Sequence, residues 1–173
     1  LNFYHSRGDD FIDTRTISSN TYKYDNITKV KISGIEEELR YRINDNWTLT
    51  QSHAFNRSTV DEDATDSTLN GNDLSLQARH QAGIRLIYAD PELFTISSIL
   101  RYVGSMYSDL ENTYKLEDYY SFDLEMAKRL NENVEFSLSF ENLFDKKYEI
   151  PNKATEDIVS PGRIIMGSLT VKW

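Results

Sequence analysis

The feature that most constrains this chain is a strict alternation of apolar and polar residues in its C-terminal part. In the segment 133–142, NVEFSLSFEN, every second residue from Val134 to Phe140 is apolar, and the residues between them are Glu or Ser. The segment 120–128 repeats the pattern. Successive side chains of a strand point to opposite faces, so the alternation predicts strands with one apolar face and one wet face.

The same pattern, followed along the chain, predicts an all-β protein of about eight strands. We expect these strands at 1–13, 22–43, 46–57, 74–89, 93–107, 114–129, 133–149 and 162–173. Short polar turns are expected at 44–46, 90–92 and 130–132, and long polar loops at 14–21, 58–73, 108–113 and 150–161. Short turns at one end, long loops at the other and long strands together predict antiparallel, up-and-down transmembrane β-barrel strands.

Composition excludes several classes of function. Lys and Arg number 19 against 28 Asp and Glu, so the net charge is −9 and a nucleic-acid partner is not expected. The absence of cysteine rules out disulfides and zinc–thiolate sites. No apolar run of about 18 residues occurs, so no transmembrane helix is predicted.

The candidate sites favour structural interpretations. The acidic stretch 59–73 has the oxygen ligands that calcium prefers, but it lacks the EF-hand spacing, and we expect an acidic solvated loop. The histidines lie on three different predicted strands without metal-ligand spacing, and no Gly-x-Ser-x-Gly turn occurs. We therefore expect no enzyme, no cofactor and no metal site. The histidines are His5, His53 and His80.

Four motifs, in order, resemble the C-terminal part of a TonB-dependent outer-membrane receptor. The strongest is ENLFDKKYE (141–149), followed by PGR (161–163) and an alternating last strand that ends in an aromatic residue. The hairpin 26–55, the segment LRYVGSMYSD (100–109) and the segment LEDYYSFDLEMAKRL (116–130) supply the others. Each motif is weak alone, but together they cover nearly the whole chain.

The resemblance implies a barrel of about 22 strands with a plugged lumen in the cell outer membrane. Residues 1–173 would be the C-terminal segment of its barrel domain, with the plug domain and the N-terminal coupling segment absent. The implied function is energised uptake of a scarce ligand, such as a siderophore, metal chelate, cofactor or glycan. The implied partners are outer-membrane lipid, the plug, the remaining strands and the TonB energy-coupling complex.

Two residue sets carry further expectations. The last strand, with Leu169, Val171 and Trp173 on one face, resembles the signal read by the barrel-assembly machinery. An inward charge network that faces the plug is expected from charged residues on the wet face of the strands. Its members are Glu36, Glu38, Arg40, Arg42 and Arg85.

The hairpin 30–55 is the least membrane-like part of the chain. If Leu39 faces lipid, then Glu37 does so too, and a turn near residue 45 would place Glu37 opposite His53, where the two could pair. A bulge near Gly34 would instead shift the register.

Two other classes of protein fit the pattern less well. The even strand count and alternating loops also suit a freestanding eight-stranded outer-membrane barrel with a structural or adhesive role. The start at Leu1, inside an alternating segment, and the large-barrel motifs favour a piece of a longer protein. A soluble β-sheet binding module is favoured only by the polar hairpin.

Overall fold

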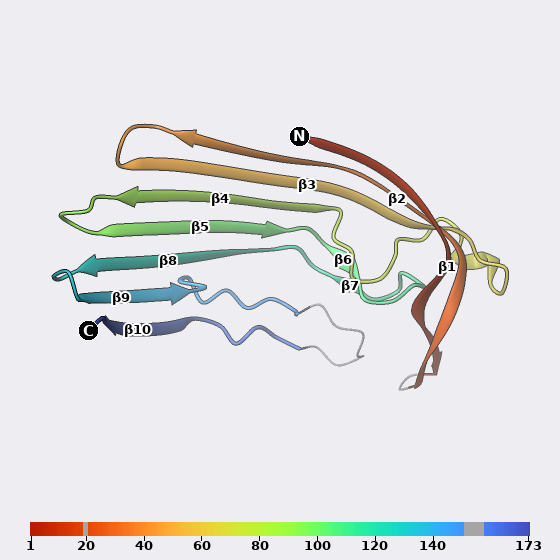
Figure 1. Ribbon diagram of the computed structural model, residues 1–173. Coiled ribbons are helices and arrows are strands. Elements are labelled where there is room, and N and C mark those ends of the chain that lie inside the picture. The colour runs from red at the N-terminus through yellow and green to blue at the C-terminus, as the bar shows by residue number, and fades with distance from the viewer. Residues whose placement is uncertain (19–20, 151–157) are drawn as a thin grey trace.

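The computed structural model describes residues 1–18, 21–150 and 158–173. Within these residues, eight strands form the main sheet, two short strands form a second sheet, and one 3₁₀ turn is present (Figure 1). The main strands are β1 (Asn2–Ser18), β2 (Thr21–Arg42), β3 (Trp47–Glu62), β4 (His80–Ala89), β5 (Thr95–Val103), β8 (Tyr119–Arg129), β9 (Val134–Glu141) and β10 (Ile164–Val171). The short elements are β6 (Met106–Tyr107), β7 (Lys115–Leu116) and the turn η1 (Ser67–Leu69). No helix in these ranges is long and apolar enough to cross a bilayer.

The main sheet follows the order of the chain. Its strand order is β1-β2-β3-β4-β5-β8-β9-β10, and each neighbouring pair is antiparallel. The predicted up-and-down arrangement of about eight antiparallel strands is therefore confirmed. The sheet is open and curved, with β1 and β10 at its two edges (Figure 1).

The connections differ in length at the two ends of the sheet, as predicted. Residues 43–46, 90–94 and 130–133 form short turns at the end on the left of Figure 1. The connections 63–79 and 104–118 lie at the opposite end and carry β6, β7 and η1. The predicted loop 150–161 falls largely outside the described residues.

The prediction of a long loop at 14–21 is wrong. Strand β1 continues to Ser18 and β2 begins at Thr21, with Thr14 paired to Tyr24 and Ser18 to Thr21. Apart from Ile17 the segment is polar in sequence and lacks apolar alternation, but the backbone of its described residues still pairs in the ladder. Backbone hydrogen bonding, which does not depend on an apolar face, extends this hairpin beyond the rest of the sheet.

Four predicted strands are too long. The strands expected at 74–89 and 114–129 begin only at His80 and Tyr119, and those expected at 93–107 and 133–149 end at Val103 and Glu141. Several apolar residues beyond these limits pack inside the loop region instead of continuing the main sheet, although Phe144 is 75% exposed. Those with buried side chains are Leu74, Ala78, Met106 and Leu116.

The buried apolar core lies at the long-loop end. Val30 of β2 and Val60 of β3 pack with Leu69, Leu74 and Leu110, which come from the two long connections. Val30 and Glu36 are an even number of residues apart on β2, so the loops fold onto the sheet face that carries Glu36. Along the rest of the sheet, the opposite, apolar face is exposed: Leu39 is 60% exposed and Leu169 is 63% exposed.

Candidate functional site

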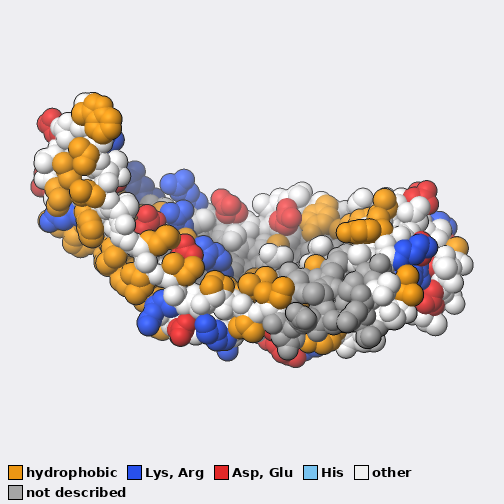
Figure 2. Space-filling view, turned by 90° about the horizontal axis from the view of Figure 1, so that it is seen from below, with side chains coloured by type: hydrophobic (Ala, Val, Ile, Leu, Met, Phe, Trp, Pro, Cys, Tyr) orange, Lys and Arg blue, Asp and Glu red, His pale blue; other side chains and the backbone are white. Residues whose placement is uncertain are grey.

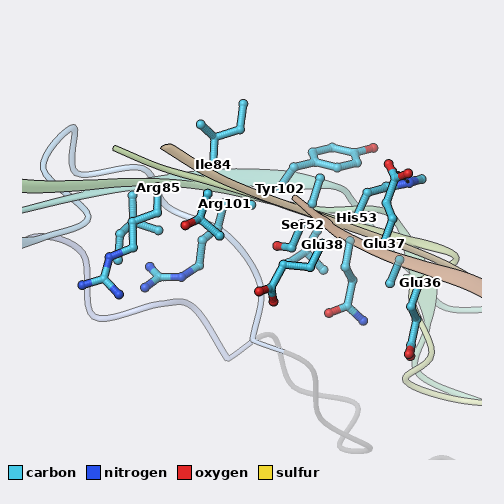
Figure 3. A pocket seen from close by; sticks show the side chains of 16 residues that line it. Glu36, Glu37, Glu38, Ser52, His53, Ile84, Arg85, Arg101 and Tyr102 are labelled. Carbon is cyan, nitrogen blue, oxygen red and sulfur yellow. Dashed lines mark ion pairs between the residues drawn. The ribbon is translucent and has the colours of Figure 1, made fainter. Parts of the chain in front are cut away.

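The sheet separates a charged face from an apolar face. Glu36, Glu38, Arg85 and Arg101 project from one side, whereas Glu37, His53, Ile84 and Tyr102 project from the other (Figure 3). Strand register explains the grouping, because Arg40 lies opposite Thr50, and Thr50 lies opposite Arg85. In Figure 2, hydrophobic side chains follow the outside of the bend, and acidic and basic side chains gather in its hollow.

The five residues predicted to form a lumen charge network share the charged face but do not pair with one another. Arg42 forms an ion pair with Asp45 at 2.9 Å, and the Nε of Arg85 donates to the Oγ of Ser97 at 3.1 Å. Within the described residues, no ion pair joins any two of the predicted five. Glu36, Glu38 and Arg85 line a shallow depression of about 510 Å³, whereas Arg40 and Arg42 do not. An electrostatic link between the five residues through the plug stays a prediction.

Sequence reasoning missed one ion pair on this face. Arg101 of β5 pairs with Asp123 of β8, and Asp123 also accepts a hydrogen bond from the backbone amide of Asn142 at 2.9 Å. Alternation within 95–103 places Arg101 on the wet face, so its position in the sequence was enough to assign it to the charged face. Its partner could not, because the pairing of β5 with β8 skips the inserted strands β6 and β7.

A polar cluster lies on the apolar face, on strands β2, β3 and β4. Glu37 lies opposite His53, as predicted, and its Oε1 is 3.8 Å from the Nδ1 of His53. The Nε2 of His53 is 3.4 Å from the Nδ1 of His80. The alternative of a bulge near Gly34 is wrong, because the irregularity in this pair of strands lies between Lys29 and Val30.

Aromatic pairs mark two levels of the apolar face. Trp47 and Tyr88 contact each other near the short turns, with ring centroids 5.0 Å apart. Tyr102 and Tyr120 form a second pair, at 4.9 Å, nearer the long loops. Aromatic residues at two levels of an apolar band are typical of the two membrane–water interfaces of a transmembrane barrel.

The last strand presents its apolar residues on the same outer face. Leu169 lies opposite Phe136 and Val171 lies opposite Val134, so the predicted alternation continues across the final hairpin. Trp173 follows β10 and is fully exposed. The role of these three residues in barrel assembly stays a prediction.

The two long connections fold together as one unit. The backbone amide of Asp73 donates to the Oδ1 of Asn112 at 2.8 Å, and the Nδ2 of Asn112 donates to the carbonyl of Asp73 at 2.9 Å. The Nδ2 of Asn72 donates to the carbonyl of Leu110 at 2.9 Å. With the shared apolar core, these hydrogen bonds give the loop end a defined shape over the charged face.

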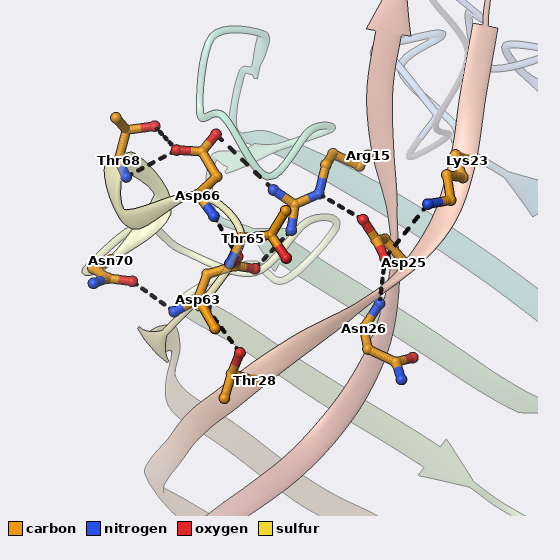
Figure 4. A network of polar contacts seen from close by, with 11 residues as sticks. Arg15, Lys23, Asp25, Asn26, Thr28, Asp63, Thr65, Asp66, Thr68 and Asn70 are labelled. Atoms are coloured by element: carbon orange, nitrogen blue, oxygen red, sulfur yellow. Dashed lines mark hydrogen bonds and ion pairs between the residues drawn. The ribbon is translucent and has the colours of Figure 1, made fainter.

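A buried ion pair anchors the connection 63–79 to the β1–β2 hairpin (Figure 4). The guanidinium of Arg15 lies 2.7 Å from the carboxylate of Asp63, whose side chain has no exposed surface, and 3.3 Å from that of Asp25. Asp63 also accepts hydrogen bonds from the backbone amides of Thr65 and Asp66, at 2.9 and 2.8 Å.

The acidic stretch 59–73 is neutralised by basic side chains, and a purely solvated loop is the wrong description at Asp63. Within the described residues, no group of three or more His, Asp or Glu side chains could hold a metal ion. The hydroxyl and amide of Thr68 hydrogen-bond to Asp66 and hold the pKa of that carboxyl below its ordinary value. The ion pairs are Asp61 with Lys31, Glu62 with Lys29, Asp63 and Asp66 with Arg15, and Asp73 with Arg79.

Fold and surface together define a segment of a transmembrane β-barrel. The family described as TonB dependent receptor-like, beta-barrel matches residues 1–143, and the chain belongs to this family. The chain is 25% identical over 134 residues to the probable TonB-dependent siderophore receptor PiuA of Acinetobacter baumannii. That alignment covers 72% of this chain and only 18% of the relative.

Solved structures show the same fold. The siderophore receptor PiuA from Acinetobacter baumannii superposes with a TM-score of 0.81 and 20% identity, over 99% of this chain and 25% of that one. The copper transporter OprC superposes with a TM-score of 0.81 and 24% sequence identity, over 98% of this chain and 27% of that one. The ferric yersiniabactin uptake receptor FyuA from Yersinia pestis superposes with a TM-score of 0.79 and 18% sequence identity, over 98% of this chain and 26% of that one. The chain therefore corresponds to about a quarter of each of these receptors.

Proposed function

We propose that residues 1–173 are the C-terminal segment of the barrel domain of an outer-membrane receptor that imports a scarce ligand with energy from the TonB complex. The observation that carries the proposal is a sheet of eight consecutive antiparallel strands with an exposed apolar face and a charged opposite face. Membership of the receptor family supports it. The plug, the coupling segment and the other strands would belong to the longer protein.

The two faces and the loop end would have separate roles in that receptor. The apolar face would contact outer-membrane lipid, and the charged face would contact the plug. The folded loop unit, which lies over the charged face, would form part of the entrance for the ligand. The class of ligand would be a siderophore, metal chelate, cofactor or glycan, and the names of the related siderophore receptors and the copper transporter favour a metal chelate.

The first test is the intact mass of the native gene product in the outer-membrane fraction, detected through a peptide that covers 133–149. A receptor predicts a mass several times 20.1 kDa. A mass near 20.1 kDa would instead support a freestanding eight-stranded barrel with a structural or adhesive role. The even strand count favours that second class, but β1 and β10 do not pair in the described sheet.

The second test is uptake by whole cells that carry or lack the intact gene. Cells would be supplied with radiolabelled ferric and cupric chelates, before and after the proton-motive force is dissipated. The proposal expects gene-dependent accumulation that stops on dissipation, while surface binding remains. Accumulation that survives dissipation would mean passive entry and would refute an energised receptor.

The third test concerns the predicted charge network. Alanine at Glu36, Glu38 and Arg85 in the intact protein should expose the plug to protease, because the plug would lose its electrostatic contacts. The barrel should keep its heat-modifiable mobility on a gel. Glu37→Ala, on the opposite face, serves as the control. An unfolded barrel in the triple variant would show that these residues stabilise the sheet itself.

A further inference from the structure

The long connection 63–79 carries a chemically reactive pair of residues at its turn. Asn70 and Gly71 form the one Asn-Gly dipeptide of the sequence, and both residues are exposed. The dipeptide follows the turn η1, and Gly71 has a φ of 91°, a conformation that glycine adopts without strain. A Cβ on Gly71 would meet open space, so no neighbour shields the turn on that side.

An asparagine side chain loses ammonia most readily before glycine, because glycine has no side chain that hinders ring closure. The backbone nitrogen of Gly71 attacks the Cγ of Asn70, so that a new N–Cγ bond forms and the bond from Cγ to Nδ2 breaks. The side-chain nitrogen leaves as ammonia with the proton of the Gly71 amide, and a cyclic succinimide remains. Water then opens the ring at either carbonyl and leaves aspartate or isoaspartate.

The docked connection holds Asn70 in a geometry that cannot close this ring. Its ψ of 122° turns the amide nitrogen of Gly71 away from the side chain of Asn70. The Oδ1 of Asn70 accepts from the backbone amide of Asp63 at 2.8 Å, and the amide of Gly71 donates to the carbonyl of Val60 at 2.9 Å. Ring closure needs rotation about ψ, which would pull the Gly71 amide away from Val60.

The product of the reaction does not fit the docked position. Val60 of β3 also donates to the carbonyl of Asn72 at 2.9 Å, so Gly71 and Asn72 pair with the same residue. Isoaspartate adds one carbon to the backbone just before Gly71 and displaces this pairing. Aspartate adds a negative charge beside the amide of Asp63, whose carboxylate holds Arg15. Either product therefore weakens the docking of the connection.

We propose that Asn70 is a deamidation site that docking of the connection 63–79 protects, and that its modification releases the connection irreversibly. Opening of the Arg15–Asp63 anchor frees the ψ of Asn70 and lets the ring close. Ring closure is slow compared with local opening, so its rate follows the population of the open state. The inference goes beyond the proposed function, because it concerns the loop end whatever ligand the receptor takes.

Peptide mapping by mass spectrometry tests the proposal on the intact protein, folded in detergent and incubated in a mildly alkaline buffer. Asp63→Ala should raise the rate of deamidation at Asn70 roughly 100-fold, because it breaks a buried ion pair. Asp66→Ala, at a carboxylate that is 43% exposed, should raise the rate less than about fivefold. In the heat-denatured protein, the wild type and both variants should react at one rate, because the docked geometry is lost.

Three outcomes would overturn the proposal. Equal rates in the wild type and Asp63→Ala would show that the buried pair does not control the reaction. A folded wild type that reacts as fast as the denatured protein would show that docking gives no protection. The amide of Leu74 donates to the carbonyl of Ser58 at 2.9 Å, and unchanged hydrogen exchange there after full conversion of Asn70 would show that modification does not release the connection. If Asp63→Ala does not assemble, Arg15→Gln breaks the same pair and should also accelerate the reaction.

Discussion

The sharpest prediction concerns Asp63→Ala at the buried ion pair. The substitution removes the carboxylate that accepts from Arg15 at 2.7 Å and from two backbone amides, at a side chain with no exposed surface. Removing one member of a buried ion pair costs about 3–5 kcal/mol. Because Arg15 keeps Asp25 at 3.3 Å, we expect the low end of this range, about 3 kcal/mol.

That cost should appear as local opening of the connection 63–79. At about 1.4 kcal/mol per tenfold change, the open population rises roughly 100-fold. The readout is hydrogen exchange, in the intact protein, at the amides of Gly71 and Leu74. These amides donate to the carbonyls of Val60 and Ser58 of β3, both at 2.9 Å, and so report whether the connection is docked.

The matched control is Asp66→Ala. The Asp66 carboxylate is 43% exposed and lies 3.9 Å from Arg15, and exposed ion pairs contribute only about 0–1 kcal/mol. We therefore expect less than about fivefold faster exchange at Gly71 and Leu74. Exchange in Asp63→Ala within threefold of the wild type, or equal opening in the two variants, would refute the conclusion that the buried pair holds the connection in place.

Three further predictions test other parts of the chain. Gly34→Ala should lower the temperature at which the barrel loses its folded gel mobility, because a Cβ there would clash with the carbonyl oxygen of Phe55. The control Gly83→Ala should be tolerated, because its Cβ would meet the hydroxyl of Ser52, and equal melting temperatures of the two variants would contradict the prediction. Trp173→Ala should reduce the amount of assembled barrel in the outer membrane, and Trp173→Phe should restore it; unchanged assembly would refute the predicted signal. The carboxyl of Asp66 has a pKa below its ordinary value of 3.8 in the folded protein. Its contribution to stability is therefore complete above pH 3.8 and is lost as the pH falls through the lowered pKa. Nuclear magnetic resonance titration of this carboxyl would check the prediction, and a midpoint above 3.8 would contradict it.

The predicted charge network shows how far sequence reasoning reaches toward a site. Parity along β2 placed Glu36, Glu38, Arg40 and Arg42 on one face, and register brought Arg85 to the same face. The alternation of side chains along a strand does not show which charged residues form ion pairs, because pairing depends on the reach of each side chain and on its neighbours from other strands. Arg42 consequently pairs with Asp45 of its own turn, and not with another member of the set.

The sequence by itself determined the number, order and antiparallel direction of the main strands and the face of their alternating side chains, but not all of the strand limits. The pairing of Glu37 with His53 was one of two alternatives that it left open. The predicted features follow from local geometry, because side chains alternate along a strand and a short turn sets the register of the hairpin that it closes. The resemblance to TonB-dependent receptors was confirmed by the family match over residues 1–143, which covers three of the four motifs; the motif that begins at residue 141 lies largely beyond it.

Only the tertiary structure showed how the two long connections, 63–79 and 104–118, fold at the loop end. Arg15 and Asp63 are 48 residues apart, and Asn112 joins Asp73 from 39 residues away. The apolar residues of the loops follow no regular period, so nothing local shows whether Leu110 continues a strand or packs against Val30. Such contacts arise when separate connections fold onto one face of the sheet, and burial and charge pairing between distant residues then select the arrangement.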